Sequence, residues 1–258
     1  MSISEPDTHD TKPTVRRKLL DVRDLRVGYG KAEVVHGVSF SIMAGEFVVF
    51  LGRNGAGKST ILHAISGLIP KRGGEVTFGG IDLATATPRA IVRAGVVQVL
   101  EGHRVFTTMS VEDNLLLGTY ARESRGDRTK LERIYALFPE MAERRNQLAS
   151  RLSGGQQQIL AIAQGIIGEP RLLILDEPSG GLAPIVVDRI LEVATALRDG
   201  GIAVLLVEQL VEKALRHADR VYLFDTGRVA GSGTPVEIKR TDLLHRIYLG
   251  LASDAAQR

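Results

Sequence analysis

Residues 52–60, Gly-Arg-Asn-Gly-Ala-Gly-Lys-Ser-Thr, constrain the fold of this chain more than any other stretch. They follow the apolar run 47–51, which is typical of a buried strand, and lead into a helix-forming run at 60–68. The pattern G-x-x-x-x-G-K-[ST] between a strand and a helix predicts a phosphate-binding turn in an α/β protein. A glycine-rich turn that binds nothing is the alternative, but such a turn has no use for Lys58 and Ser59 at that offset.

The chemistry of this turn follows from its residue types. Glycines at 52, 55 and 57 permit backbone angles that a Cβ would forbid, so successive N–H groups can converge on phosphate oxygens at the positive end of the next helix. We expect Lys58 to reach the β- and γ-phosphates of a nucleotide and the Ser59 hydroxyl to be a ligand of Mg²⁺. The expected nucleotide-binding residues of the turn are Gly52, Arg53, Asn54, Gly55, Ala56, Gly57, Lys58, Ser59 and Thr60.

Two adjacent carboxylates end a second apolar run. Residues 172–175, Leu-Leu-Ile-Leu, are typical of a strand buried on both faces, and Asp176 and Glu177 follow directly. Ligands of parallel sheets bind beyond the carboxyl ends of the strands, so both side chains are expected beside the phosphate-binding turn. We expect Asp176 to support Mg²⁺ through its water shell and Glu177 to act as the general base on an attacking water. Solvated acids at a strand end are the less favoured alternative.

Two further stretches each have two interpretations. In residues 152–158, Leu-Ser-Gly-Gly-Gln-Gln-Gln, Ser153 and Gln156 occupy the two positions of a capping box, while the glycine pair exposes N–H groups suited to a phosphate. The residues alone favour neither. Tyr29 is either an ordinary hairpin aromatic or a flat platform for a purine, and its position shortly before the phosphate-binding strand favours the purine.

Composition narrows the class of protein. No apolar run approaches the roughly 20 residues of a membrane-spanning helix, and residues 1–13 are polar, without the apolar core of an export signal. The absence of cysteine excludes disulfides and thiolate zinc sites and is typical of a cytosolic protein. The net charge of +3 comes from interspersed charges, and aromatic residues are only 5%, so a nucleic-acid partner is not expected.

Periodicity predicts the elements around these motifs. Residues 1–18 are expected to be a disordered tail, and a helical block inside the α/β pattern predicts an inserted subdomain. Expected strands are 19–27, 38–42, 47–51, 75–78 between the glycine pairs 73–74 and 79–80, 95–100, 172–175, 202–207, and 221–224 followed by a hairpin turn. Expected helices are 60–68, 111–120, one with an apolar face at 131, 134, 135 and 138, and others that start near Ser153, Pro184 and Pro235.

With residues 52–60, 152–156 and 172–177 in this order, the chain resembles the ATP-binding subunits of ABC transporters over about residues 19–240. The stretch Leu-Ser-Gly-Gly-Gln at 152–156 is nearly private to that family. The resemblance implies an α/β fold with a P-loop NTPase (RecA-like) core, an antiparallel β subdomain, an α-helical subdomain inserted at about 102–158, and a C-terminal helix and tail at 241–258.

The same resemblance implies ATP and Mg²⁺ as cofactors, with adenine stacked on Tyr29. It also implies a sandwich dimer in which Ser153, Gly154 and Gly155, in the signature that ends at Gln156, complete the nucleotide site of the partner subunit. The expected nucleotide-binding residues of the signature are therefore Ser153, Gly154, Gly155 and Gln156.

Three positions depart from the general family pattern. Glu101 stands where most members have a glutamine, Gln209 where they have a switch histidine, and Ala183 where they have an aspartate. The stretches 101–106, 181–184 and 207–209 together resemble the subunit of branched-chain amino acid importers that pairs with a second, non-identical ATPase. A glutamine can donate a hydrogen bond to the γ-phosphate but cannot carry a proton as imidazole can. The expected metal ligands are thus Ser59, Glu101 and Asp176, and the expected catalytic residues Glu177 and Gln209.

The function so implied is an ATP-hydrolysing, energy-coupling subunit of an importer, peripheral on the cytoplasmic face of the inner membrane. Its implied partners are a second ATP-binding subunit, identical or not, two transmembrane permease subunits and, indirectly, an extracytoplasmic solute-binding protein. One alternative is an ATP-binding but weakly catalytic partner subunit in an asymmetric pair. A soluble ATPase of ribosomes or DNA is disfavoured, because such proteins usually carry two nucleotide domains or a long coiled coil. Branched-chain amino acids, urea, amides and aromatic acids all remain open as the solute.

Overall fold

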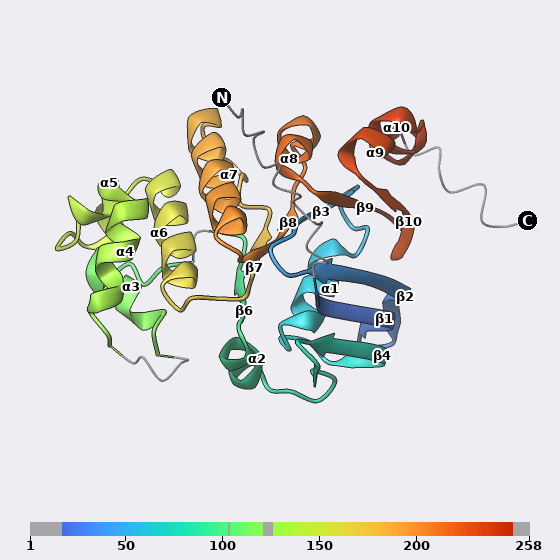
Figure 1. The fold of residues 1–258 in the computed structure, drawn as a ribbon, viewed down its shortest axis with the longest axis horizontal. Coiled ribbons are helices and arrows are strands. Elements are labelled where there is room, and N and C mark those ends of the chain that lie inside the picture. The colour runs from blue at the N-terminus through green and yellow to red at the C-terminus, as the bar shows by residue number, and fades with distance from the viewer. Residues whose placement is uncertain (1–16, 103, 121–125, 250–258) are drawn as a thin grey trace, which may run out of the picture.

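The computed structural model describes residues 17–102, 104–120 and 126–249, and Figure 1 shows them as two sheets with helices around them. A four-stranded antiparallel sheet has the order β2-β1-β4-β5, and a six-stranded sheet has the order β10-β9-β3-β8-β7-β6. In the larger sheet β9, β3, β8, β7 and β6 run parallel, and β10 pairs with β9 in the antiparallel sense. This arrangement confirms the α/β fold with an antiparallel β part.

Most elements lie where the apolar periodicity predicts them. The strands are β1 (Lys18–Tyr29), β2 (Ala32–Met43), β3 (Phe47–Gly52), β4 (Lys71–Phe78), β5 (Ile81–Asp82), β6 (Val96–Val99), β7 (Leu172–Asp176), β8 (Ala203–Val207), β9 (Arg220–Asp225) and β10 (Arg228–Gly233). The helices are α1 (Lys58–Ile65), α2 (Pro88–Ala94), α3 (Val111–Leu117), α4 (Thr129–Leu137), α5 (Pro139–Ala142), α6 (Gly154–Ile166), α7 (Pro184–Asp199), α8 (Val211–His217), α9 (Pro235–Arg240) and α10 (Leu243–Leu249), with a 3₁₀ turn at Ala149–Arg151.

The large sheet is covered on both faces. Every residue of β3, β7 and β8 is buried, as expected for central strands made almost wholly of aliphatic and aromatic residues. One face packs in a core with α6, α7 and α8, and the other packs in a second core with α1 and the small sheet. Burial on both faces fixes these three strands, so the loops at their ends start from a rigid edge.

The carboxyl ends of the three central strands lie side by side. Phe50 of β3 and Asp176 of β7 both pair with Val207, the last residue of β8. The strands are parallel, so the loops that leave them emerge at one edge of the sheet. Figure 1 shows α3, α4 and α5 gathered beside α6, away from the small sheet.

The strand predicted at 75–78 is longer than expected. β4 starts at Lys71, and the glycine pair 73–74 lies inside it instead of ending it. Gly74 has a φ of +88°, and a Cβ there would lie 2.5 Å from the backbone oxygen of Asp24 on β1. The β1–β4 register shifts between Arg23 and Arg26, so the glycine permits a bulge. The pair 79–80 does make the expected turn, between Phe78 and Ile81.

Other boundaries also differ from the prediction, and β2 begins at Ala32 instead of Val38. α3 ends at Leu117 instead of Tyr120, at a glycine whose Cβ would lie 2.0 Å from the backbone oxygen of Gln164 on α6. The helix therefore ends where the two backbones approach closely. Lys18, which was placed in the tail, is the first residue of β1. The rest of that tail up to residue 16, and the C-terminal tail from 250, lie outside the described residues.

Candidate functional site

A cavity of about 400 Å³ opens at the carboxyl edge of the large sheet. Residues that are far apart in the sequence meet there: the turn after β3, Glu101 after β6, Glu177 after β7 and Gln209 after β8. The residues lining it are Val34, Asn54, Gly55, Gly57, Lys58, Ser59, Thr60, Glu101, Glu177 and Gln209. Among the predicted site residues of the turn, Gly52, Arg53 and Ala56 do not line it, although they shape the same loop.

The turn after β3 needs glycine at two positions. Gly52 has a φ of +152°, and a Cβ on it would lie 2.3 Å from the backbone oxygen of Phe224 on the neighbouring strand. Gly57, the N-cap of α1, has a φ of +92° in the left-handed region that favours glycine. These conformations direct the start of α1, with its unpaired N–H groups, toward the cavity.

Lys58 is buried at the base of this turn. Its ammonium donates hydrogen bonds to the backbone oxygens of Gly52 at 2.8 Å and Arg53 at 3.0 Å. Burial lowers the pKa of Lys58, while the carboxylates of Glu177 and Asp176 raise it by a smaller amount. The side chain thus holds the loop in shape and presents a cation that has no carboxylate in ion-pair contact among the described residues. Such a cation suits an anion from outside the chain.

Asp176 is also buried, with an exposure of 3%. The Ser59 hydroxyl donates to its Oδ1 at 3.0 Å, and His63 Nε2 lies 3.8 Å from its Oδ2. Burial raises the pKa of Asp176, and the hydrogen bond from Ser59 and the charge of His63 oppose that rise. Within the described part of the chain no Lys or Arg forms an ion pair with it. The structure thus leaves this carboxylate short of positive charge.

Glu177 and Gln209 are in direct contact. Gln209 Nε2 donates a hydrogen bond to Glu177 Oε2 at 2.5 Å. Glu177 has a φ of +45°, unusual for a residue with a side chain, and its N–H donates to the backbone oxygen of Val207 at 3.0 Å. A sparsely populated backbone conformation held by neighbouring strands is typical of a functional residue, and here it places the carboxylate at the cavity.

The donor set fits Mg²⁺ shared with a phosphate. Ser59, Asp176 and Glu101 offer a hydroxyl and two carboxylates, all oxygen ligands of the kind that Mg²⁺ prefers. Among the described residues there is no group of three His, Cys, Asp or Glu side chains that could hold a metal ion by themselves. Mg²⁺ in proteins is usually held by one or two carboxylates, with waters and a substrate phosphate completing its coordination.

Two predicted elements of the site lie away from the cavity. Tyr29, at the end of β1, is 49% exposed and does not line it. Ser153 lies at the start of α6, where its hydroxyl accepts from the N–H of Gln156 and the Gln156 side chain accepts from the N–H of Ser153. The capping interpretation is confirmed. The glycines of the signature do not reach the chain's own phosphate-binding turn.

Sequence reasoning missed one buried acid beside the site. Glu208, the residue after β8, is 1% exposed and accepts hydrogen bonds from Ser179 and from the backbone of Gln209. Its position directly after a fully apolar strand could have indicated a buried acid at the site. Tyr248 of α10 was also missed: burial raises its pKa, and a hydrogen bond with the backbone of Gly52 opposes that rise.

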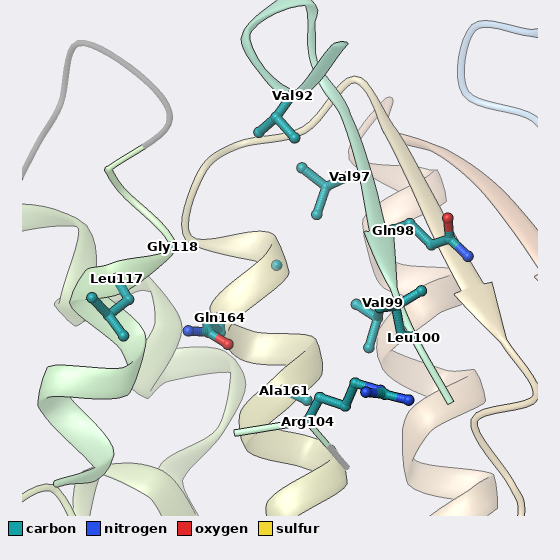
Figure 2. Close-up of a pocket in the computed structure, with 11 residues that line it drawn as sticks. Val92, Val97, Gln98, Val99, Leu100, Arg104, Leu117, Gly118, Ala161 and Gln164 are labelled. Atoms are coloured by element: carbon teal, nitrogen blue, oxygen red, sulfur yellow. The ribbon is translucent and has the colours of Figure 1, made fainter. Parts of the chain in front are cut away.

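A second cavity, of about 290 Å³, lies between β6, α3 and α6 (Figure 2). Val97 and Val99 lie on the same side of β6, whereas Gln98 points to the opposite side. The Gln98 amide is buried there without a hydrogen-bond partner among the described residues. The residues lining the cavity are Val92, Val97, Gln98, Val99, Leu100, Arg104, Leu117, Gly118, Ala161, Gln164 and Gly165.

Comparison with known proteins gives several matches. The model of a family described as ABC transporter matches residues 35–180. BraG of Pseudomonas aeruginosa, named a high-affinity branched-chain amino acid transport ATP-binding protein, is 38% identical over 222 residues, which are 86% of this chain and 95% of BraG. LptB of Escherichia coli, named a lipopolysaccharide export system ATP-binding protein, is 31% identical over 90% of this chain and 97% of LptB. A solved ATP-binding subunit of an ABC transporter superposes with a TM-score of 0.79 at 30% identity, covering 91% of this chain and 100% of that one.

Proposed function

Because the chain belongs to the ABC transporter family, as an ATP-hydrolysing subunit, we propose that it couples ATP hydrolysis to import of branched-chain amino acids or a related small polar solute. The observation that carries the proposal is the meeting of Lys58, Glu177 and Gln209 at one cavity beside the phosphate-binding turn. The solute class is supported by the 38% identity to BraG over most of both chains.

In the proposed reaction the chain's own residues bind the nucleotide and move one proton. Lys58 and the N–H groups of residues 54–60 hold the phosphates of ATP. Mg²⁺, held by Ser59 and supported by Asp176 and Glu101, would neutralise phosphate charge when bound. Glu177 takes a proton from the attacking water as general base. Gln209 orients that carboxylate through the 2.5 Å hydrogen bond and offers a neutral donor to the γ-phosphate.

The proposed assembly requires a second ATP-binding subunit, identical or not. Ser153 and Gly154 are exposed at the start of α6 and lie apart from the chain's own cavity. We infer that the signature residues of each subunit complete the nucleotide site of the other, with adenine stacked on Tyr29. A helix start at exposed residues is suited to the γ-phosphate that such a partner would present.

Membrane partners complete the proposal. In the part of the chain that the structure describes, no helix has both the length and the apolar character needed to cross a membrane. On the likeness to BraG, we propose that the chain lies on the cytoplasmic face of the inner membrane, bound to two permease subunits and, through them, to an extracytoplasmic solute-binding protein. The cavity of Figure 2, with its valine and leucine lining, is suited to a short amphipathic helix of a permease.

Steady-state ATP hydrolysis by the purified subunit, alone and mixed with a second ATP-binding subunit, tests the catalytic part. Lys58→Ala is the negative control. Lys71→Ala is the matched control, because Lys71 is also a lysine that donates to a backbone oxygen and whose pKa is lowered by burial. Turnover that needs Lys58 and not Lys71 supports the proposal. Turnover only in the mixture, unaffected by Glu177→Gln in this chain, would favour the weakly catalytic partner instead.

The solute is tested in proteoliposomes that contain this subunit, its second ATP-binding subunit and the two permease subunits. Uptake of labelled leucine, urea and benzoate is measured with ATP inside the vesicles, with the Lys58→Ala complex as blank. We expect uptake of leucine alone. Uptake of urea or benzoate without leucine would replace the amino-acid assignment and keep the coupling role.

A further inference from the structure

Glu208 is a buried carboxylate that joins two loops of the site. It follows β8 directly and is 1% exposed. Its Oε1 accepts from the Ser179 N–H at 3.1 Å, and its Oε2 accepts from the Ser179 hydroxyl at 2.8 Å. Oε2 also accepts from the N–H of Gln209 at 2.9 Å and from that of Leu210 at 3.4 Å.

The two loops held in this way are those of the proposed catalytic residues. Ser179 lies two residues after Glu177, and Gln209 follows Glu208 directly. A neighbouring cavity of about 380 Å³ is lined by residues of both loops, including Ser179, Leu210 and both members of the Glu177–Gln209 pair. A shift of either loop would therefore change the distance between the general base and its glutamine.

Burying the charge of Glu208 costs free energy unless hydrogen-bond donors compensate it. A buried carboxylate needs several donors, and within the described part of the chain Glu208 has four donors and no Lys or Arg in ion-pair contact. A carboxylate accepts at both oxygens, so it can serve all four of these donors at once. An amide in its place would turn an N–H₂ group toward at least one of those N–H donors.

We propose that Glu208 is a positioning residue: it fixes the loop after β7 and the loop after β8 to each other, and so sets the Glu177–Gln209 geometry for hydrolysis. The expected effect on turnover rests on the proposed ATPase function. The contacts by which Glu208 joins the two loops are a property of the fold and can be measured without nucleotide.

The test measures kcat, nucleotide affinity and amide exchange for Glu208→Gln in the ATP-binding pair. We expect kcat to fall about tenfold or more, because small misplacements of reacting groups carry losses of this size. Affinity for ADP should stay within about twofold, since Lys58 and the phosphate-binding turn are untouched. Amide exchange should rise together in residues 179–182 and 208–212, with no rise in α1.

Two further variants separate positioning from general damage. Ser179→Ala removes one donor and should lower kcat by about threefold or more, whereas Ser179→Thr keeps the hydroxyl and should restore it. In a Gln209→Ala background, Glu208→Gln should lower kcat by less than about twofold more, because it acts through Gln209.

Each other outcome overturns the inference. Wild-type kcat in Glu208→Gln, a full additional loss in the Gln209→Ala background, or exchange that rises in one loop only would each show that Glu208 does not couple the loops. If wild-type turnover does not depend on Lys58, the proposed function fails by itself, and amide exchange still decides whether Glu208 joins the two loops.

Discussion

Among the described residues, Glu46 and Asp219 at the amino-terminal edge of the large sheet are paired with arginine, whereas Asp176 and Glu177 at the carboxyl-terminal edge are not. Glu46, just before β3, lies 2.7 Å from the Arg220 guanidinium and accepts the Met43 N–H at 2.7 Å. Asp219, just before β9, lies 2.8 Å from Arg198 and accepts the N–H at the start of β3. At the opposite edge Asp176 and Glu177 accept hydrogen bonds from the neutral Ser59 and Gln209 side chains.

This difference separates acids that stabilise the fold from acids that are available to a ligand. Acids with an arginine partner have their charge balanced within the chain, and removing one partner leaves the other uncompensated. Acids held only by neutral donors keep charge available for a cation that arrives from outside. The carboxyl edge also carries Lys58, whose ammonium has only backbone oxygens as hydrogen-bond partners among the described residues. This edge therefore suits an anionic phosphate, and we propose that Mg²⁺ accompanies it.

The largest expected effect is on turnover at the carboxyl edge. Glu177→Gln keeps the size and hydrogen-bonding capacity of the side chain but removes the base, so hydrolysis should fall by ~10²–10⁴-fold. ATP affinity should be kept, since Lys58 and the turn are unchanged. Single-turnover hydrolysis and nucleotide binding measure the two quantities. A loss of less than about threefold would show that Glu177 is not the base.

The matched change at the amino edge should act on stability instead. Glu46→Gln loses the charge that holds Arg220 and weakens the bond to Met43, so unfolding free energy should fall by about 2 kcal/mol. For a chain of this size that corresponds to a decrease in Tm of about 4–8 °C. Urea unfolding and calorimetry measure it. A reduced kcat of Glu46→Gln at a temperature well below its Tm would show that the amino-terminal edge also affects catalysis, against this assignment.

A third change should raise the stability of the nucleotide-free chain while impairing function. Asp176→Asn removes a buried charge that has no Lys or Arg partner in the described residues and keeps an acceptor for the Ser59 hydroxyl. We expect a gain of roughly 1 kcal/mol near pH 7 in metal-free buffer. Loss of stability in the variant under those conditions would mean that His63 already balances the charge.

The pH dependence of that gain follows from the raised pKa of Asp176. Because the folded pKa lies above the ordinary value of 3.8, the carboxyl contributes stability below that value and loses it as the pH rises through the folded pKa. The advantage of Asp176→Asn should therefore be greatest at neutral pH and disappear in acid. Urea unfolding of both proteins over this range measures the difference.

Much of this fold could be predicted because its central strands are short apolar runs. β3, β7 and β8 were placed within a residue or two, since apolar runs this short are typical of central strands in a parallel sheet. β4 was misjudged because Gly74 ends a strand in most sequences, and only the close approach of β1 makes it a bulge. The end of α3 likewise depended on contact with α6.

The site divides in a similar way. Lys58, Ser59 and Glu177 were predicted because their motifs encode local geometry: a strand, a turn and the residue type that the chemistry needs. Glu208 was missed because its role depends on Ser179, a contact between loops that lie 29 residues apart. The proposed role of the signature at Ser153 needs a second subunit, so contacts within one chain do not show it.

The smallest expected effect is on the pH dependence of stability at the amino-terminal edge of the sheet. His217, at the end of α8, lies 2.7 Å from the Thr195 hydroxyl and next to the Phe47 ring, remote from the turn at Lys58. Burial lowers the pKa of His217; Asp188 and Glu192 oppose this, while Arg198 and Arg216 add to it. The pKa of His217 in the folded chain lies below 6.5. The neutral imidazole therefore contributes to stability above pH 6.5, and this contribution is lost as the pH falls through the folded pKa.

Replacing the His217 imidazole should remove this loss of stability in acid. His217→Gln keeps a polar partner for Thr195, so the decrease in Tm between about pH 7.5 and pH 5 should be smaller than in the wild type. The difference should amount to at most about 0.5 kcal/mol, because solvent screens a partly exposed group. Calorimetry at the two pH values measures it, with Thr195→Val as the control that keeps the ring. Turnover near neutral pH should not change, because no step of the proposed reaction uses the amino edge of the sheet.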